Sequence, residues 1–235
     1  MYKKTITLIS GGLDSAVTSY LAKKQSSYLF GLTFLYGQRH EREIKSAEII
    51  GENLNLTHHI FFPIDISQFG GSSLFVTSKE PIPHLKSIDD IGKNIPSTYV
   101  PARNTIFLSI ALAYSETIDA DCIAIGVNAA DYSGYPDCRP KFIKTYQKLI
   151  NVATKKTVEG KQITLFTPLL HLTKGEIIKK GYNIGVPFKH TWSCYRGENK
   201  ACGQCDSCLL RLKGFQEANL TDPISYEKTP PWYKQ

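Results

Sequence analysis

The sequence predicts an α/β fold, a three-layer sandwich in which helices cover both faces of a parallel sheet. Short apolar segments of strand length alternate with segments of helical period in the first half of the chain. Such alternation implies right-handed crossovers between parallel strands. The 235 residues are 42% apolar, which is enough for one sizeable core but leaves little for a second full domain.

The expected elements follow one another along the chain. Buried strands are predicted at Thr5–Ile9, Leu29–Leu35, His59–Ile66 and Cys122–Gly126. Helices are predicted at Ala16–Lys24, Arg39–Asn53, Ile106–Thr117, Lys141–Thr154 and Lys174–Lys180. The second of these helices turns Ile44, Ala47, Ile50 and Leu54 toward the sheet, and we expect its charged beginning, Arg39, Glu41, Arg42 and Glu43, to face solvent.

Residues 66–97 interrupt this pattern. Gly70, Gly71 and several prolines preclude long regular elements there, so we expect an excursion or a lid. A Cys-rich segment ends the chain. We therefore divide the protein into an α/β domain, 1–190, and a Cys-rich C-terminal segment, 191–235, packed on it.

Charge and targeting signals limit the classes of function. The net charge of +7 favours anionic ligands such as nucleotides, but the basic residues form no long run, so nucleic-acid binding is not expected. The apolar stretch Ile6–Ile9 is too short for a signal peptide, and no stretch is long enough to span a bilayer. The six cysteines then indicate a reducing cytoplasm, where closely spaced thiols suggest metal binding or redox work.

A phosphate-binding loop is predicted between the first strand and the first helix. Ser10-Gly11-Gly12-Leu13-Asp14-Ser15 follows the strand directly, so backbone N–H groups and a helix N-terminus can face an anion. The glycines allow close approach of phosphate, and the serines add hydroxyl donors. Asp14 would repel phosphate, so we expect it to cap the helix or to hold Mg²⁺. The predicted ATP-binding residues are Leu8, Ile9, Ser10, Gly11, Gly12, Leu13, Asp14 and Ser15.

This loop is neither a Walker loop nor a dinucleotide fingerprint, because the residues that define those motifs are absent. It resembles the PP-loop, Ser-Gly-Gly-x-Asp-Ser, of ATP pyrophosphatases. That resemblance implies an enzyme that uses ATP to adenylate a carbonyl oxygen.

Four cysteines near the C-terminus predict a metal site. Cys194, Cys202, Cys205 and Cys208 have the two-residue gaps typical of tetrahedral zinc sites, and four protein ligands indicate a structural ion. An iron–sulfur cluster and a redox pair remain alternatives. Asp206 or Ser207 is expected to cap a short helix whose apolar face is Leu209, Leu210, Leu212 and Phe215.

The other two thiols lie elsewhere in the chain. Cys122 is expected to be inert packing in a strand. Cys138 adjoins Arg139, whose charge could lower the pKa of the thiol, although a plain structural thiol is the preferred interpretation.

Three further segments are expected to form the rim of an active site. They are Val100–Asn104, Gly126–Pro140 and Leu172–Ile177. The second directly follows a strand, and ligands of open α/β sheets bind outside the carboxyl ends of the strands. This places the segment beside the phosphate loop.

Together these segments resemble the 7-cyano-7-deazaguanine synthase (QueC) family over nearly the whole chain. The resemblance rests on the loop Ser10–Ser15, the four cysteines, and the stretches Leu35–His40, Pro101–Asn104 and Gly134–Arg139. It implies an adenine nucleotide α-hydrolase-like, Rossmann-like fold, a zinc ion and a homodimer. It also implies conversion of 7-carboxy-7-deazaguanine, ammonia and ATP to the nitrile that leads to queuosine.

Roles for single residues follow from this chemistry. Lys174 or Arg103 is expected to offset charge at phosphorus, with Asp14 and Mg²⁺ at the phosphates. Asp131, Tyr132 and Arg139 are candidates for binding the deazaguanine substrate. A tRNA thiolase of the PP-loop type, an ammonia-dependent amide synthetase and a nucleic-acid-binding module remain alternatives.

Overall fold

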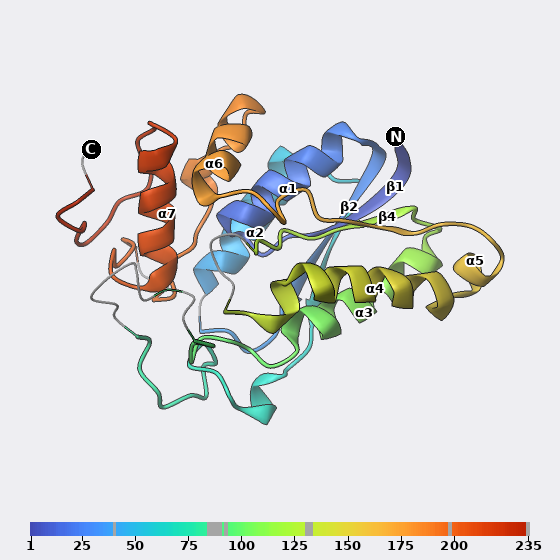
Figure 1. Ribbon diagram of the computed structural model, residues 1–235, viewed down its shortest axis with the longest axis horizontal. Coiled ribbons are helices and arrows are strands. Elements are labelled where there is room, and N and C mark those ends of the chain that lie inside the picture. The colour runs from blue at the N-terminus through green and yellow to red at the C-terminus, as the bar shows by residue number, and fades with distance from the viewer. Residues whose placement is uncertain (40, 84–90, 92–93, 130–133, 197–198, 234–235) are drawn as a thin grey trace.

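The computed structural model describes residues 1–39, 41–83, 91, 94–129, 134–196 and 199–233 (Figure 1). Five strands form one sheet in the order β3-β2-β1-β4-β5, and every neighbouring pair is parallel. The strands are β1 (Tyr2–Leu8), β2 (Ser26–Leu35), β3 (His58–Pro63), β4 (Cys122–Ala124) and β5 (Thr164–Phe166). The order reverses direction between β1 and β4, so a ligand crevice is expected where the carboxyl ends of these two strands diverge.

Seven α-helices lie in the described parts of the chain. They are α1 (Leu13–Lys24), α2 (Glu41–Asn53), α3 (Arg103–Thr117), α4 (Pro140–Ala153), α5 (Lys155–Val158), α6 (Lys174–Asn183) and α7 (Asp206–Glu217). Short 3₁₀ turns occupy η1 (Ser67–Phe69), η3 (Pro136–Cys138) and η4 (Phe188–His190).

Helices cover both faces of the sheet, which confirms the predicted three-layer sandwich (Figure 1). One apolar cluster packs α3 and α4 against the sheet, and a second packs α1, α2, α6 and α7 on the opposite face. Strand β1 contributes Ile6 and Leu8 to the first cluster, and Ile9, directly after the strand, belongs to the second.

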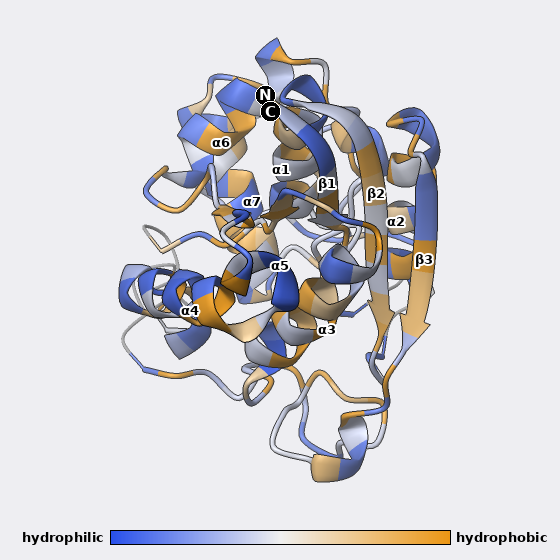
Figure 2. Cartoon of the chain, turned by 90° about the vertical axis from the view of Figure 1, so that its right-hand side faces the viewer, coloured by the Kyte–Doolittle hydropathy of each residue, from blue (hydrophilic) through white to orange (hydrophobic). Residues whose placement is uncertain are grey.

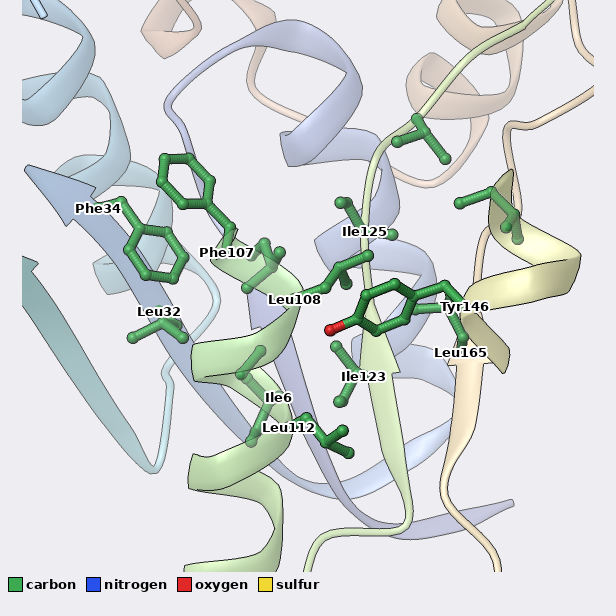
Figure 3. Packing of buried hydrophobic residues seen from close by; sticks show 14 of the residues in the cluster. Ile6, Leu32, Phe34, Phe107, Leu108, Leu112, Ile123, Ile125, Tyr146 and Leu165 are labelled. Atoms are coloured by element: carbon green, nitrogen blue, oxygen red, sulfur yellow. The ribbon is translucent and has the colours of Figure 1, made fainter. Parts of the chain in front are cut away.

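Figure 3 shows the core under α3 and α4, where Ile6, Leu32 and Ile123 of the sheet meet Leu108 and Leu112 of α3. At its edge the rings of Phe34 and Phe107 stack with centroids 3.9 Å apart. Figure 2 shows β1, β2 and β3 side by side, with β3 hydrophilic where it begins and apolar where it ends.

Some element boundaries differ from prediction. Strand β3 ends at Pro63 instead of Ile66, because Asp65 accepts hydrogen bonds from the N–H and hydroxyl of Ser67 and turns the chain. Strand β5 was not predicted, since three residues are too short for a periodic signal.

The excursion at 66–97 contains no α-helix or ladder strand among its described residues, as predicted. Arg39, which follows β2, binds this segment through its side chain. Its guanidinium donates to the carbonyls of Phe75 at 2.9 Å and Glu80 at 3.1 Å, and to that of Ser78.

The C-terminal segment packs on the α/β layers through α7, which lies along α6 (Figure 1). The helix begins after Cys205 and has no side-chain cap, so the predicted cap by Asp206 or Ser207 is wrong. Arg211 of α7 forms a buried ion pair with Asp222, 2.7 Å between Nε and Oδ2. No helix in the described part of the chain is both long and apolar enough to cross a membrane.

Candidate active site

The predicted phosphate loop is a tight turn between β1 and α1. Its shape is held by the Ser15 hydroxyl, which accepts from the N–H of Ser10 at 3.2 Å and donates to the carbonyl of Gly12 at 3.0 Å. The Ser10 hydroxyl accepts from the N–H of Gly12 at 3.3 Å. The first N–H groups of α1 have no intrahelical acceptor, so this end of the helix suits an anion.

Gly11 brings this loop into direct contact with α2. Its φ is +83°, and a Cβ placed at Gly11 would lie 2.1 Å from the carbonyl oxygen of Glu43 and 2.8 Å from the backbone nitrogen of Ala47. On the other side, Trp192 donates its backbone N–H to the Gly11 carbonyl at 2.9 Å. A glycine is therefore required at this position by both space and conformation.

Asp14 and Lys174 meet at the floor of the site. Lys174 Nζ lies 2.8 and 2.7 Å from the two carboxylate oxygens of Asp14, and both side chains are largely buried. Lys174 is the first residue of α6, which a reciprocal capping box between Thr173 and Glu176 fixes in place. Gly12 occupies the N-cap of α1 with no side-chain cap, so the expectation that Asp14 caps that helix is wrong.

A cavity of about 290 Å³ opens above this ion pair, at the carboxyl ends of β1 and β4. All the predicted ATP-binding residues except Gly11 line it, and so do both predicted cations, Lys174 and Arg103. Its apolar walls include Leu8, Leu32, Phe34, Ile44, Leu74, Phe107, Ile125 and Val127. The cavity therefore combines an apolar space with a phosphate-binding floor, as a nucleotide site requires.

Arg103 reaches the cavity from the first turn of α3. It donates to the Tyr36 hydroxyl at 3.4 Å, and its guanidinium lies 5.9 Å from the centroid of that ring. Burial opposes its charge, but Tyr36, Tyr135 and Asp137 raise the pKa of Arg103 above its ordinary value. Arg103 thus remains a half-buried cation facing the cavity.

Glu43 lies on the cavity wall, contrary to the expectation that it faces solvent. It is four residues before Ala47 and seven before Ile50, so it shares the helix face that packs on the sheet. That spacing was the available signal. Tyr135, from the predicted rim segment Gly126–Pro140, also lines the cavity. Sequence reasoning did not identify Trp192, Ser193 and Tyr195, which lie in the loop before the cysteine cluster.

Of the three predicted substrate-binding residues, the structure describes only Arg139. Asp131 and Tyr132 lie outside the described residues. Arg139 is exposed at the N-cap of α4 and is absent from the cavity lining. Asn128 and Cys138, from the same predicted rim segment, do line it.

The two thiols outside the cysteine cluster are poor nucleophiles. Burial raises the pKa of Cys138 to about 12, and the neighbouring Asp137 adds to the rise. Burial likewise raises the pKa of Cys122 to about 12. Both therefore remain protonated at neutral pH, in agreement with their interpretation as structural thiols.

The four C-terminal cysteines form one buried cluster. The Sγ atoms of Cys194, Cys202, Cys205 and Cys208 all lie within 4.8 Å of one another. Sulfur atoms on a tetrahedral zinc ion with bonds of about 2.3 Å would be about 3.8 Å apart, and Cys202 Sγ is 3.9 Å from Cys208 Sγ. The N–H of Cys202 points at Cys194 Sγ at 3.3 Å, as expected for a thiolate acceptor. The cluster fits a zinc site.

Curated relatives are similar to this chain over nearly their full length. The 7-cyano-7-deazaguanine synthase of Geobacter sp. (strain M21) is 50% identical over 97% of this chain and 100% of its own length. That of Paramagnetospirillum magneticum is 51% identical over 95% of this chain and 99% of its own. Among solved structures, NMN synthetase from Francisella tularensis aligns with 93% of this chain and 78% of its own at 17% identity, with a TM-score of 0.49 that is too low for any conclusion.

The sequence model of the family described as queuosine biosynthesis protein QueC matches residues 4–219. The match includes the phosphate loop, Lys174, Arg103, Glu43 and the four clustered cysteines. The chain belongs to the QueC family.

Proposed function

We propose that the protein is a 7-cyano-7-deazaguanine synthase, which converts 7-carboxy-7-deazaguanine and ammonia to the nitrile at the expense of ATP, in queuosine biosynthesis. The full-length similarity to relatives of that name carries the choice of substrate. The cavity supports the chemistry, because it joins an anion-binding loop to two half-buried cations, Lys174 and Arg103.

The reaction first activates the carboxylate. One carboxylate oxygen attacks the α-phosphorus of ATP, and pyrophosphate leaves toward the N–H groups of the loop Ser10–Ser15. Lys174, oriented by Asp14, offsets the charge that develops at phosphorus. Arg103 lies across the cavity and would attract the substrate carboxylate. Ammonia then displaces AMP to give the amide, and the same activation of the amide oxygen allows the nitrile to form.

Metal ions have separate roles in this proposal. The four clustered cysteines would hold one zinc ion per chain, and with four protein ligands this ion organises the segment around it. Mg²⁺ would enter with the ATP phosphates and neutralise part of their charge. Asp14 could bind it only by giving up Lys174, which engages both of its oxygens.

We also propose a homodimer and a cytoplasmic location. The first follows from the family resemblance. The second follows from the chemistry, because the reaction consumes ATP and none of the six cysteines forms a disulfide, as is usual in a reducing compartment.

Mass spectrometry of the purified protein with 7-carboxy-7-deazaguanine, ammonium and Mg-ATP tests the proposal. The expected products are the nitrile and two AMP per nitrile. Accumulation of the amide with one AMP would identify an amide synthetase instead. Absence of AMP and of both products from folded, zinc-loaded protein would contradict the proposal.

A tRNA thiolase is the less favoured alternative. Such an enzyme needs a reactive cysteine near the adenylated base, and Cys138 is the cysteine that lines the cavity within the described chain. Its high pKa does not suit a sulfur carrier.

A further inference from the structure

Glu43 is held against the phosphate loop by the backbone. Its carbonyl oxygen occupies the space that a Cβ at Gly11 would need, so the backbone of the first turn of α2 packs directly against the backbone of the loop. Its side chain lines the same cavity as Asp14, Lys174 and Arg103. A carboxylate is therefore fixed at the edge of the place where adenylation is proposed to occur.

This carboxylate has no partner in the part of the chain that the structure describes: no hydrogen bond or ion pair to Glu43 is found there. Its neighbours are engaged. The Arg42 guanidinium lies 3.8 Å from the ring centroid of Trp192 and donates to the Asn199 carbonyl. Asp14 is bound by Lys174. A polar group that lines a cavity without a partner is suited to bind a ligand.

The charges that face Glu43 come from three other elements. Burial raises the pKa of Glu43 to about 7, Arg103 of α3 lowers it, and Cys194 raises it further. Tyr36, at the end of β2, feels the Glu43 charge in turn. The carboxyl group can therefore both accept and release a proton near neutral pH.

The proposed reaction requires such a group twice. Ammonium must lose a proton before its nitrogen can attack, and the adenylated amide must lose a nitrogen-bound proton as AMP leaves. Asp14 is neutralised by Lys174, and the Cys138 thiol is too weak an acid to be a thiolate. Glu43 is the remaining carboxylate among the described residues that line the cavity.

We propose that Glu43 binds the ammonium ion and accepts its proton, an inference that rests on the proposed function. In the first step the proton passes to Glu43, the freed electron pair forms the C–N bond, and AMP leaves with the electrons of the C–O bond. A second proton then passes to water and leaves the neutral amide. Glu43 then releases its proton to water. Adenylation of the amide oxygen gives a cationic imidate, which loses one nitrogen-bound proton to water. In the dehydration AMP leaves with the electrons of the C–O bond, the remaining proton on nitrogen passes to Glu43, and the N–H electron pair becomes the third C–N bond.

Three assays on Glu43→Gln separate these steps. Exchange of labelled pyrophosphate into ATP with 7-carboxy-7-deazaguanine, without ammonium, should stay within about threefold of wild type, because adenylation needs no proton acceptor. Formation of amide from acid and ammonium, and of nitrile from the amide, should each fall by about 100-fold or more. Glu48→Gln, an exposed position on the same helix, should change none of the three.

The pH dependence gives a second readout. At fixed total ammonium, wild-type amide formation should rise up to about pH 7, as Glu43 ionises, and then level off. Amide formation by Glu43→Gln should instead follow the free ammonia concentration and keep rising, so the deficit shrinks at high pH. Nitrile formation from the amide should not recover. Glu43→Asp should restore part of both rates.

Loss of pyrophosphate exchange in folded Glu43→Gln, in parallel with the other two rates, would overturn the inference, because Glu43 would then position the substrate. Unchanged rates in all three assays would also overturn it. If wild type itself showed no exchange, the proposed function would fail first.

Discussion

Lys174 and Asp14 are 160 positions apart in the chain, yet their charged groups meet directly below the cavity. Lys174→Met should lower pyrophosphate exchange by about 10²- to 10³-fold, because the cation that offsets charge at phosphorus is lost. Lys179→Met, on the exposed side of the same helix, should retain exchange. Exchange within a few-fold of wild type in Lys174→Met would show that Lys174 only neutralises Asp14.

Gly11 offers a test of the contact between the loop and α2. Gly11→Ala should lower the free energy of unfolding by several kcal/mol and abolish ATP binding, because the new methyl group would overlap the Glu43 carbonyl. Gly160 has nearly the same φ, but a Cβ at that position would have no atom within 4 Å. Gly160→Ala should therefore cost only about 1–2 kcal/mol, the penalty of the conformation itself. Urea unfolding of both variants measures the difference, and equal losses would argue against the overlap.

At the level of single residues, the sequence identified those whose chemistry is visible in their type and spacing. The loop Ser10–Ser15 and the four cysteines are local motifs, so they could be recognised. Glu43 could not, because its role depends on a contact with Gly11 that forms only in the folded chain. Arg139 belongs to the predicted rim segment Gly126–Pro140, yet it is exposed and does not line the cavity, and the local sequence does not encode that orientation.

The bounds of a helix or strand could be predicted where they depend only on the residues of that element. Helix α3 begins at Arg103, three residues before the predicted start at Ile106, because Asp137 accepts the N–H of Asn104 at 3.0 Å. A cap supplied from another loop leaves no local signal. Strand β5 is likewise defined by its pairing with β4.

Helix α7 depends on one buried ion pair. Asp222→Asn should lower the free energy of unfolding by about 3–5 kcal/mol, because Arg211 would lose its charged partner in a buried site. The exposed pair Lys213–Glu217 on the same helix provides the contrast, and Lys213→Ala should cost less than about 0.5 kcal/mol. Chemical denaturation measures both. A loss below about 1 kcal/mol in Asp222→Asn would show that the pair is not an anchor.

For the whole molecule, the alternation of strands and helices predicted the layers, and the phosphate loop indicated where ligands bind. The order of the strands follows from crossovers that a local pattern does not contain. The sequence also does not show that the C-terminal segment, 191–235, forms one wall of the cavity. Trp192, Ser193 and Tyr195 lie in that wall.

Removal of the metal site should therefore affect both stability and catalysis. Cys208→Ser should lose its zinc, unfold at lower temperature and show reduced pyrophosphate exchange, because the 191–196 wall is no longer held. Cys122→Ala, which removes a buried thiol elsewhere, should keep one zinc per chain even if it is less stable. Elemental analysis and thermal unfolding measure these outcomes. Iron and visible absorption in the wild type would instead indicate an iron–sulfur cluster.

The hydrogen bond from Trp192 to Gly11 joins the metal-binding segment to the phosphate loop at 2.9 Å. Linkage between two binding sites is reciprocal, so whatever factor the metal contributes to nucleotide affinity, the nucleotide returns to metal affinity. Copies engaged in turnover would then hold their zinc more tightly than idle copies. When zinc is scarce, copies with bound nucleotide would be the last to lose their zinc ion.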